Sequence, residues 1–420
     1  MKSDLIDSKG NNLVFLLCTP RSGSSLATVM LQNHSKMFAT QEMWFLMSLV
    51  DLQSPQRRAY GGTGIVSQFF NGVLPHETFE DACRAFALQV YNGLLQSSAR
   101  AELVIDKSPR YYYLLEFLDA LFPHSRRIWL IRNPFSVLAS YKKVNQQRGV
   151  GFDLTEGLRN PGFDMKIADL TVGLFRYYQY FAKDNLYAHR LHYERLVADP
   201  KAQLSEVCRF LGCDYEEGME KYGNFMNSAK SDLYFSMGVG DPFVANHTEP
   251  NQESVAIWKG VLDKREIELY GRALGAQIFH DLGYAEQLDE AEKLTGVRFE
   301  MEPDTELIAL RAKQLADATG CRWEEGYAMK SEAAAGRSLA LTEHQFVPVD
   351  GTRPDNTLQL QMTVRALEKR LELGAMEKRH LKSQLDAMNR KISRLKSLIP
   401  FGSRLSTLAS TYLTSGGGKK

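Results

Sequence analysis

A short run of small, polar and basic residues, Thr19-Pro-Arg-Ser-Gly-Ser-Ser25, has the composition of a loop that binds a phosphate-like anion. It follows a short apolar run, residues 13–18, and opens a predicted helix. Glycine permits a tight turn, after which backbone N–H groups point at an anion on the helix N-terminus. Serine hydroxyls and the planar guanidinium add further donors. An ordinary strand–turn–helix junction with a capping serine is the structural alternative. The predicted contacts are Arg21, Ser22, Gly23, Ser24 and Ser25.

Nucleotide and sugar kinases also contain a phosphate-binding loop between a strand and a helix, so a kinase is the main alternative. A kinase loop would read G-x-x-x-x-G-K-[S/T], with the hydroxyl on a metal ion. Here the preceding strand ends in Cys18 instead of Gly, and Ser24 instead of Lys follows Gly23. The sequence therefore predicts a loop for phosphate-like anions that is not a Walker A loop.

A second candidate anion site is Arg132-Asn-Pro-Phe-Ser-Val-Leu-Ala-Ser140. Arg132 stands at the carboxyl end of an apolar run, residues 127–131, and Pro134 suits the first turn of a helix. Ser140 then lies two turns into that helix, so both side chains can grip one phosphate. The alternative is that Arg132 caps a sheet edge and Ser140 faces solvent.

The elements that must position these residues alternate along the chain. Predicted strands cover residues 13–18, 103–106, 127–131 and 187–193. Predicted helices cover residues 25–32, 79–97, 111–121, 134–144, 167–184, 200–211, 264–282 and 304–318. Strands separated by helices predict an α/β fold with a mostly parallel sheet, in which ligands bind at the carboxyl ends of the strands. Both anion motifs fall at such ends.

In order and spacing, these motifs resemble those of the sulfotransferases that use 3′-phosphoadenosine 5′-phosphosulfate (PAPS), in the branch with tyrosylprotein sulfotransferases and many bacterial relatives. The resemblance covers roughly residues 13–284, including a stretch at 191–212 similar to the family's Y-E-D-L-V-x-x-P … F-L-G. It implies a P-loop-like three-layer α/β/α fold. It also implies that residues 20–25 hold the 5′-phosphosulfate, that Arg132 and Ser140 hold the 3′-phosphate, and that Tyr193 lies near the cofactor.

The resemblance also implies the catalytic groups. Glu42 matches the Glu that serves as the base in the tyrosylprotein branch, with a surface helix-cap carboxylate as the alternative. Lys107, in Asp-Lys-Ser-Pro109, matches the family's D-K-x-P and would stabilise the leaving group together with Arg21. The cytosolic enzymes use a His as base, but neither His34 nor His124 has the matching context. Further contacts are expected from Ser254, in a late loop that includes Trp258, and from Arg110.

The amino-acid composition limits the general class of protein to which the chain can belong. The 420 residues are 44% hydrophobic and 24% charged, with a formal net charge of +1, so a soluble globular protein that binds no nucleic acid is predicted. No run reaches the ~18 apolar residues of a membrane span. The cysteines lack the paired spacings of a zinc site, which predicts reduced thiols, a cytoplasmic location and no metal. They are Cys18, Cys83, Cys208, Cys213 and Cys321.

We expect a catalytic domain at residues 11–295, a helical extension at 296–330, a linker at 331–357, a coiled coil at 358–399 and a disordered tail at 400–420. From Leu360 to Ile399, apolar residues recur at alternating spacings of three and four, interrupted around Gly374. Residues 364–404 hold eleven basic and four acidic residues. A homodimer through this helix is predicted, and contact with a membrane surface or a partner protein stays open.

The sequence thus predicts transfer of a sulfuryl group from PAPS to a hydroxyl acceptor (carbohydrate, lipid, metabolite or tyrosine), with release of adenosine 3′,5′-bisphosphate. Two irregular insertions, residues 51–79 and 144–169, are expected to line the acceptor pocket. The alternatives are a non-catalytic anion-binding scaffold on a coiled coil and a nucleotide or sugar kinase.

Overall fold

The computed structural model describes residues 5–39, 42–53, 62–97, 101–147, 149–223, 248–321, 323–330, 342–347 and 356–398. The chain divides into two units, Met1–Thr357 and Leu358–Lys420.

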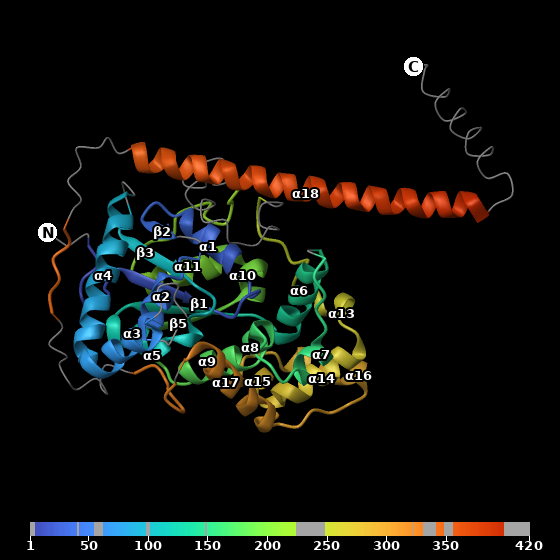
Figure 1. Ribbon diagram of the computed structural model, residues 1–420, viewed down its shortest axis with the longest axis horizontal. Helices are drawn as coiled ribbons and strands as arrows, with labels where there is room; N and C mark the ends of the chain where they lie inside the picture. The colour runs from blue at the N-terminus through green and yellow to red at the C-terminus, as the bar shows by residue number, and fades with distance from the viewer. Residues whose placement is uncertain are drawn as a thin grey trace, which may run out of the picture. The chain divides into compact units, whose positions relative to one another are not determined.

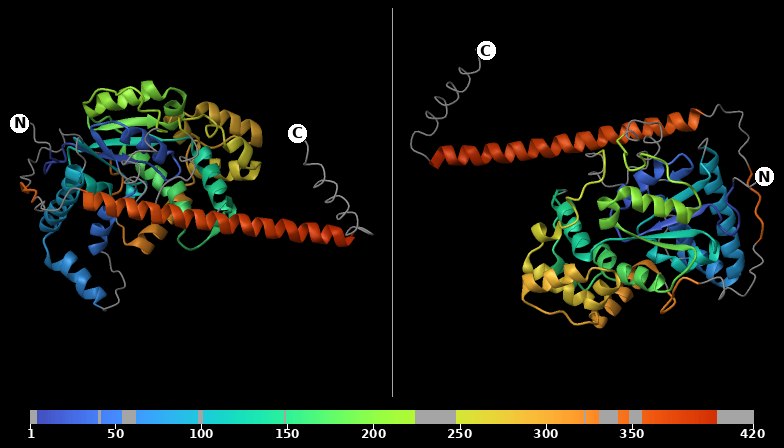
Figure 2. Two further views of the ribbon diagram at one scale, coloured as in Figure 1. Left: turned by 90° about the horizontal axis from the view of Figure 1, so that it is seen from above. Right: turned by 180° about the vertical axis from the view of Figure 1, so that it is seen from behind.

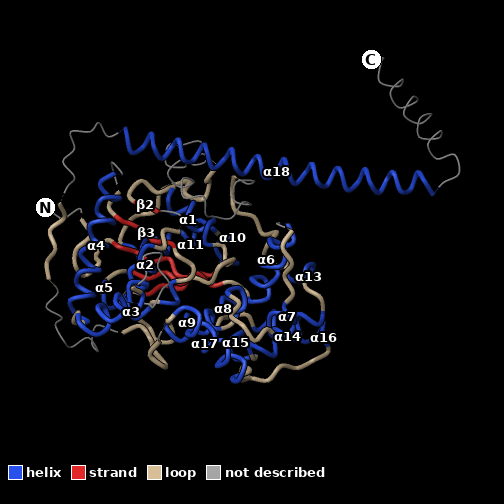
Figure 3. Tube along the Cα trace, in the orientation of Figure 1, coloured by secondary structure: helices blue, strands red, loops and turns tan. Residues whose placement is uncertain are grey.

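The first unit is built on a sheet of five parallel strands (Figures 1 and 3). The strands, in the order β2-β3-β1-β4-β5 across the sheet, are β1 (Leu13–Leu17), β2 (Met37–Ala39), β3 (Leu103–Lys107), β4 (Arg126–Ile131) and β5 (Ala188–His192). The four predicted strands are present. β2 was not predicted because its apolar run, Met37–Ala39, has only three residues.

The central strand β1 is buried on both faces, as its uninterrupted apolar sequence indicates. Leu13, Phe15 and Leu17 pack into one apolar cluster, whereas Val14 and Leu16 pack into a second one. Because side chains alternate along a strand, these clusters lie on opposite faces of the sheet. The fold is therefore a P-loop-like three-layer α/β/α arrangement, with helices on both faces (Figure 2).

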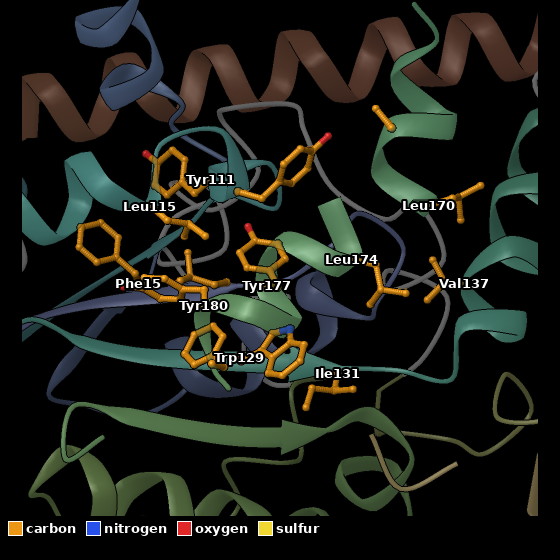
Figure 4. Packing of buried hydrophobic residues seen from close by; sticks show 14 of the residues in the cluster. Phe15, Tyr111, Leu115, Trp129, Ile131, Val137, Leu170, Leu174, Tyr177 and Tyr180 are labelled. Atoms are coloured by element: carbon orange, nitrogen blue, oxygen red, sulfur yellow. The ribbon is translucent and has the colours of Figure 1, made fainter. Parts of the chain in front are cut away.

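Different helices supply the two outer layers. The smaller cluster takes residues from α1 (Ser24–Gln32), α10 (Tyr193–Ala198) and α11 (Pro200–Leu211). The larger cluster takes residues from several helices and joins Phe15 and Trp129 of the sheet to Tyr177 and Tyr180 (Figure 4). Its helices include α4 (His76–Ser97), α5 (Leu115–Leu121), α6 (Pro134–Gln147), α8 (Met165–Leu170), α9 (Val172–Tyr180), α14 (Lys264–Leu274) and α15 (Ala276–Asp281).

Three predicted helices are divided in the structure. Residues 111–121 form a 3-10 turn, η3 (Tyr111–Tyr113), followed by α5, and Thr171 separates α8 from α9. Gly275 separates α14 from α15 with a φ of 72°, and a Cβ there would lie 2.5 Å from the backbone of Glu302. Glycine is required at this break because it alone fits both the conformation and the close approach.

The two predicted irregular insertions are largely helical, so that expectation was wrong. The first contains η1 (Asp51–Gln53), α3 (Thr63–Gln68) and a π-helical turn, η2 (Phe69–Val73). The second contains α7 (Leu154–Arg159) and most of α8. Asp153 and Asp164 cap these two helices by accepting backbone N–H bonds, a start signal that the sequence analysis left unused.

Four further helices complete the first unit. α2 (Phe45–Val50) comes between β2 and β3 in the chain, and α13 (Trp258–Val261), α16 (Ala285–Thr295) and α17 (Thr305–Thr319) follow β5. Arg311 Nη1 of α17 donates to the Asn160 carbonyl at 2.8 Å, and Trp323 Nε1 donates to the Tyr113 carbonyl at 3.0 Å. Partly buried hydrogen bonds thus attach the predicted extension to the rest of the first unit.

Most of the predicted linker lies outside the described residues. Residues 342–347 of this segment contact other parts of the first unit: Ser8 Oγ donates to the Thr342 carbonyl at 3.0 Å, and His344 Nε2 lies 3.0 Å from Asp81 Oδ1.

The described part of the second unit is one helix, α18 (Asn356–Leu398), of 43 residues. Its apolar residues on the predicted seam are exposed in the single chain: Val364, Leu367, Leu371, Leu381, Leu385, Met388 and Ile392. The predicted tail, residues 400–420, lies outside the described residues. Among the helices that the structure describes, none combines the length and apolar character needed to cross a bilayer.

Candidate active site

The predicted site residues follow the carboxyl ends of all five strands. The loop at residues 18–23 follows β1, Glu42 follows β2, and Lys107 is the last residue of β3. Arg132 follows β4, and Tyr193 follows β5. Because the strands are parallel, these ends share one edge of the sheet, where α/β proteins bind their ligands.

The loop after β1 makes a compact turn into α1. Arg21 and Gly23 have positive φ angles of 71° and 92°. Inside the turn, Ser22 N–H donates to the Thr19 carbonyl at 3.3 Å, and the hydroxyls of these two residues lie 3.0 Å apart. Gly23 is the N-cap residue of α1 and has no side chain to cap the helix, and Ser24 and Ser25 begin the first turn. The amide groups of that turn suit an anion as their partner.

Gly23 is also required by its neighbour. A Cβ at this position would lie 2.3 Å from Cδ2 of Tyr193, and the φ of 92° is unfavourable for other residues. We expect Gly23→Ala to cost about 1–3 kcal/mol of stability and to weaken anion binding at the loop, because both the turn and the ring must shift. Differential scanning fluorimetry with and without adenosine 3′,5′-bisphosphate measures both effects.

Gly296→Ala is the matched control, since Gly296 has a φ of 75° but open space where a Cβ would stand. It should lower stability by about 1 kcal/mol and leave bisphosphate binding unchanged. Equal binding losses in the two variants would contradict the role of the Gly23 turn.

Arg132 joins the loop to two other segments. Its Nη1 donates to the Arg21 carbonyl at 2.8 Å, and its Nη2 donates to the Ser254 carbonyl at 2.6 Å. The guanidinium carbon lies 4.4 Å from the centre of the Tyr193 ring. Ser254 therefore contacts Arg132 through its backbone, whereas the nearby Trp258 packs in the apolar core against Phe135.

The guanidinium of Arg132 is almost fully buried, and its Nε–H has no acceptor among the residues that the structure describes. Burial lowers the pKa of this group, and the positive charge of Arg21 acts in the same direction. A buried cation with an unused donor is costly unless an anion meets it. The position is thus suited to a phosphate.

The two predicted anion motifs meet directly. Arg21 Nε donates to Ser140 Oγ at 3.2 Å, although the residues are far apart in the chain. Ser140 lies two turns into α6, whose first residue is Pro134. The loop, Arg132 and Ser140 therefore form one continuous group of hydrogen-bonding side chains and backbone groups.

Glu42 and Lys107 form an ion pair at the neighbouring strand ends. Lys107 Nζ lies 3.2 Å from Glu42 Oε1, and the Lys107 side chain is fully buried. The side chain of Glu42 is 14% exposed, so solvent or a substrate can reach it. The pair forms because β2 and β3 are adjacent in the sheet. It places a proton acceptor and a cation side by side at the site.

Two buried carboxylates that the sequence analysis missed support these side chains. Asp106 accepts hydrogen bonds from the hydroxyls of Tyr91 at 2.6 Å and Tyr111 at 2.8 Å, directly before Lys107 in β3. Burial raises the pKa of this carboxyl, and the two hydroxyls oppose that shift. The Asp106 network therefore fixes the end of β3.

Asp169 of α8 holds Arg110, with Arg110 Nη2 at 2.9 Å from Asp169 Oδ2. The hydroxyls of Tyr112 and Tyr141 donate to the same carboxylate at 2.8 and 2.6 Å. Burial raises the pKa of Asp169, and Arg110 opposes the shift. Arg110 in turn lies 5.5 Å from the centre of the Trp44 ring. An Asp inside a helical pattern gave no sequence signal for this network.

The sheet and the loop define a P-loop-like α/β protein whose predicted anion-binding residues lie at one edge of the sheet. Residues 14–217 match the model of the sulfotransferase family. This match places residues 14–217 in a family of transferases.

Known proteins similar to this chain include the nodulation protein NoeE of Sinorhizobium fredii. It is 27% identical over 293 residues, which are 66% of this chain and 67% of that protein. Among solved structures, the sulfotransferase domain of the Synechococcus olefin synthase is 22% identical, with a TM-score of 0.42 over 61% of this chain and 92% of that domain. The sulfotransferase domain from the curacin biosynthetic pathway is 23% identical, with a TM-score of 0.41 over 61% of this chain and 95% of that domain.

Proposed function

We propose that the protein transfers a sulfuryl group from PAPS to a hydroxyl acceptor and releases adenosine 3′,5′-bisphosphate. The observation that carries this proposal is the contact between the two anion motifs through Arg21, Ser140 and Arg132. A nucleotide with phosphate groups at both its 3′ and 5′ positions requires two adjoining anion sites. The buried Nε–H of Arg132 supports an anion at the second site.

In this proposal, the loop residues Ser22, Gly23, Ser24 and Ser25 bind the 5′-phosphosulfate with Arg21. Arg132 and Ser140 bind the 3′-phosphate, and Tyr193 and Ser254 hold Arg132 in place for it. These contacts fix the reacting sulfur relative to the acceptor, which is the main requirement of such transfers.

The chemical step balances with residues of this chain alone. The acceptor oxygen forms a bond to sulfur while the bond from sulfur to the 5′-phosphate oxygen breaks. Glu42 takes the proton of the acceptor hydroxyl, and Lys107 with Arg21 stabilises the negative charge on the departing bisphosphate. The contact of 3.2 Å between Lys107 and Glu42 supports a shared role at one reacting centre. No metal ion is needed in this proposal.

The two alternative functions require different features. A kinase loop would carry a Lys and a metal-binding hydroxyl, whereas Ser24 follows Gly23 here. A non-catalytic scaffold would have no use for a partly accessible Glu42 paired with a buried Lys107. Both observations favour the sulfotransferase reaction.

A transfer assay with labelled PAPS tests the proposal. The full chain is incubated with a carbohydrate, a phenol, a lipid alcohol and a tyrosine-containing peptide, and label on each acceptor is counted. We expect transfer to at least one class, together with release of bisphosphate. Binding of the bisphosphate without transfer to any acceptor class would favour the scaffold instead.

We further propose that α18 forms a homodimeric coiled coil. The seam residues of α18 stand at spacings of three and four and are 41–74% exposed in the single chain, so a second copy would bury them. Deleting residues 358–420 is expected to leave sulfuryl transfer intact and to convert a dimer to a monomer. Sedimentation velocity measures the change. An unchanged oligomer after truncation would contradict the coiled-coil interface.

A further inference from the structure

A cluster of metal-binding side chains lies away from the proposed sulfuryl site. His34, Cys208 and Cys213 each offer a ligand atom, and these atoms lie within 4.8 Å of one another. His34 follows the C-terminal end of α1, whose N-terminus carries the anion loop. Nine helical residues at a rise of about 1.5 Å separate the two ends, so the cluster is roughly 14 Å from the loop.

The turn that ends α11 brings the two cysteines together. Cys213 N–H donates to the Cys208 carbonyl at 3.0 Å, and Gly212 N–H donates to the Arg209 carbonyl at 3.1 Å. With Gly212 at a φ of 76°, this is the hydrogen-bond pattern of a Schellman motif, in which the side chains at these two positions normally touch. Both positions are usually apolar, and here both are thiols. Their separation of five residues explains why no paired cysteine spacing was visible in the sequence.

The hydrogen bonds of His34 fix the orientation and the tautomer of its ring. Lys36 N–H donates to His34 Nδ1 at 3.0 Å, so Nδ1 carries a lone pair, and Nε2–H donates to the Asp214 carbonyl at 2.9 Å. Metal-binding histidines commonly donate their second N–H to a carbonyl in this manner. A metal ion at Nδ1 would compete with the Lys36 amide for the lone pair.

The surroundings supply further donors and hold both segments in place. Glu216 Oε1 lies 3.7 Å from His34 Nδ1, so this carboxylate borders the cluster. Ser35 N–H donates to Glu216 Oε2 at 2.8 Å, and Asn33 Nδ2 donates to the Gly218 carbonyl at 3.1 Å. The sulfur of Met219 lies 3.8 Å from Cys208 Sγ, which adds a second soft atom behind the thiol.

We propose that His34, Cys208 and Cys213 bind a zinc ion, with Glu216 or water as the fourth ligand, and that this ion joins the end of α1 to the end of α11. Two thiolates and a neutral imidazole balance the charge of Zn²⁺, and this ligand set is typical of zinc in proteins. The site revises the expectation that the protein uses no metal. Its role is structural and separate from sulfuryl transfer, because no proposed catalytic residue takes part.

Cobalt(II) substitution of the full-length protein tests the proposal. The protein is stripped with a chelator under reducing conditions and titrated with Co²⁺, and the bound cobalt is then displaced with Zn²⁺. We expect one Co²⁺ per chain, with thiolate-to-cobalt charge-transfer absorption and the visible bands of tetrahedral cobalt. Cys213→Ser should weaken binding at least about 100-fold, since loss of even a supporting contact costs about 10- to 100-fold.

Cys321→Ser is the matched control, because Cys321 is also partly buried but lies outside the cluster. It should bind Co²⁺ as the unaltered chain does. Absence of thiolate-to-cobalt absorption in the unaltered chain, or equal affinity in Cys213→Ser, would overturn the proposal. A Cys208–Cys213 disulfide formed with oxidised glutathione, without metal uptake by the reduced chain, would also overturn it. X-ray absorption spectroscopy of the zinc-loaded, unaltered chain should show sulfur and nitrogen ligands. This measurement does not depend on whether the variants fold.

Discussion

Replacing Glu42 with Gln is expected to lower kcat by about 10²- to 10⁴-fold, because an amide cannot accept the proton of the acceptor hydroxyl. The affinity for adenosine 3′,5′-bisphosphate should survive, since the loop, Arg132 and Ser140 are unchanged and Glu42 is assigned to the acceptor hydroxyl. Gln has nearly the same shape as Glu, and its carbonyl oxygen can still accept from Lys107 Nζ. The variant therefore removes the base while leaving the site assembled.

Steady-state transfer from labelled PAPS and calorimetric titration of the bisphosphate measure these two quantities separately. Glu268→Gln is the control, since Glu268 also pairs with a cation, Arg272 Nε at 3.0 Å, but on the surface of α14. It should transfer at the normal rate. Full activity in Glu42→Gln would remove Glu42 as the base.

Replacing Arg132 with Met is expected to weaken the binding of adenosine 3′,5′-bisphosphate by about 2–4 kcal/mol, because a charge-assisted contact to the 3′-phosphate is lost. This loss corresponds to a roughly 30- to 700-fold increase in Kd. Met keeps much of the volume and apolar contact of the buried side chain. Adenosine 5′-monophosphate lacks the 3′-phosphate, so its affinity should change little. The variant is thus expected to lose the preference for the bisphosphate over the monophosphate.

The control for this prediction is Arg195→Met, which removes an exposed guanidinium from α10, the helix that follows β5. It should keep the preference for the bisphosphate. If Arg132→Met weakened both nucleotides equally, Arg132 would serve the fold or the loop and would not bind the 3′-phosphate.

The sheet was largely predictable from the sequence because its strands are buried on both faces and read as apolar runs. The run at residues 13–18 and the run at 127–131 each became a strand within one residue. β2 was not predicted because Met37–Ala39 is too short to show a strand pattern. The capped helices in the segments expected to be irregular were not predicted for a different reason, since single Asp residues decide where these helices begin.

Most of the site residues could be predicted because they lie at or just after the end of a strand, but their contacts depend on the order of the strands in the sheet. Glu42 and Lys107 meet because β2 lies beside β3, which no local pattern in the chain encodes. The same holds for Arg110 with Asp169, and for His34 with Cys208 and Cys213. Contacts between residues far apart in the chain become visible only when the fold assembles them.

The measurement that tests the proposed nucleotide site most directly is thermal stability with adenosine 3′,5′-bisphosphate compared with ATP and magnesium. A ligand that binds only the folded chain stabilises it by about 2.7 kcal/mol at one hundred times its Kd. We expect the bisphosphate to raise Tm in this manner and ATP with magnesium to leave Tm unchanged. Stabilisation by ATP with magnesium and none by the bisphosphate would contradict the assignment of the loop, Arg132 and Ser140 to PAPS.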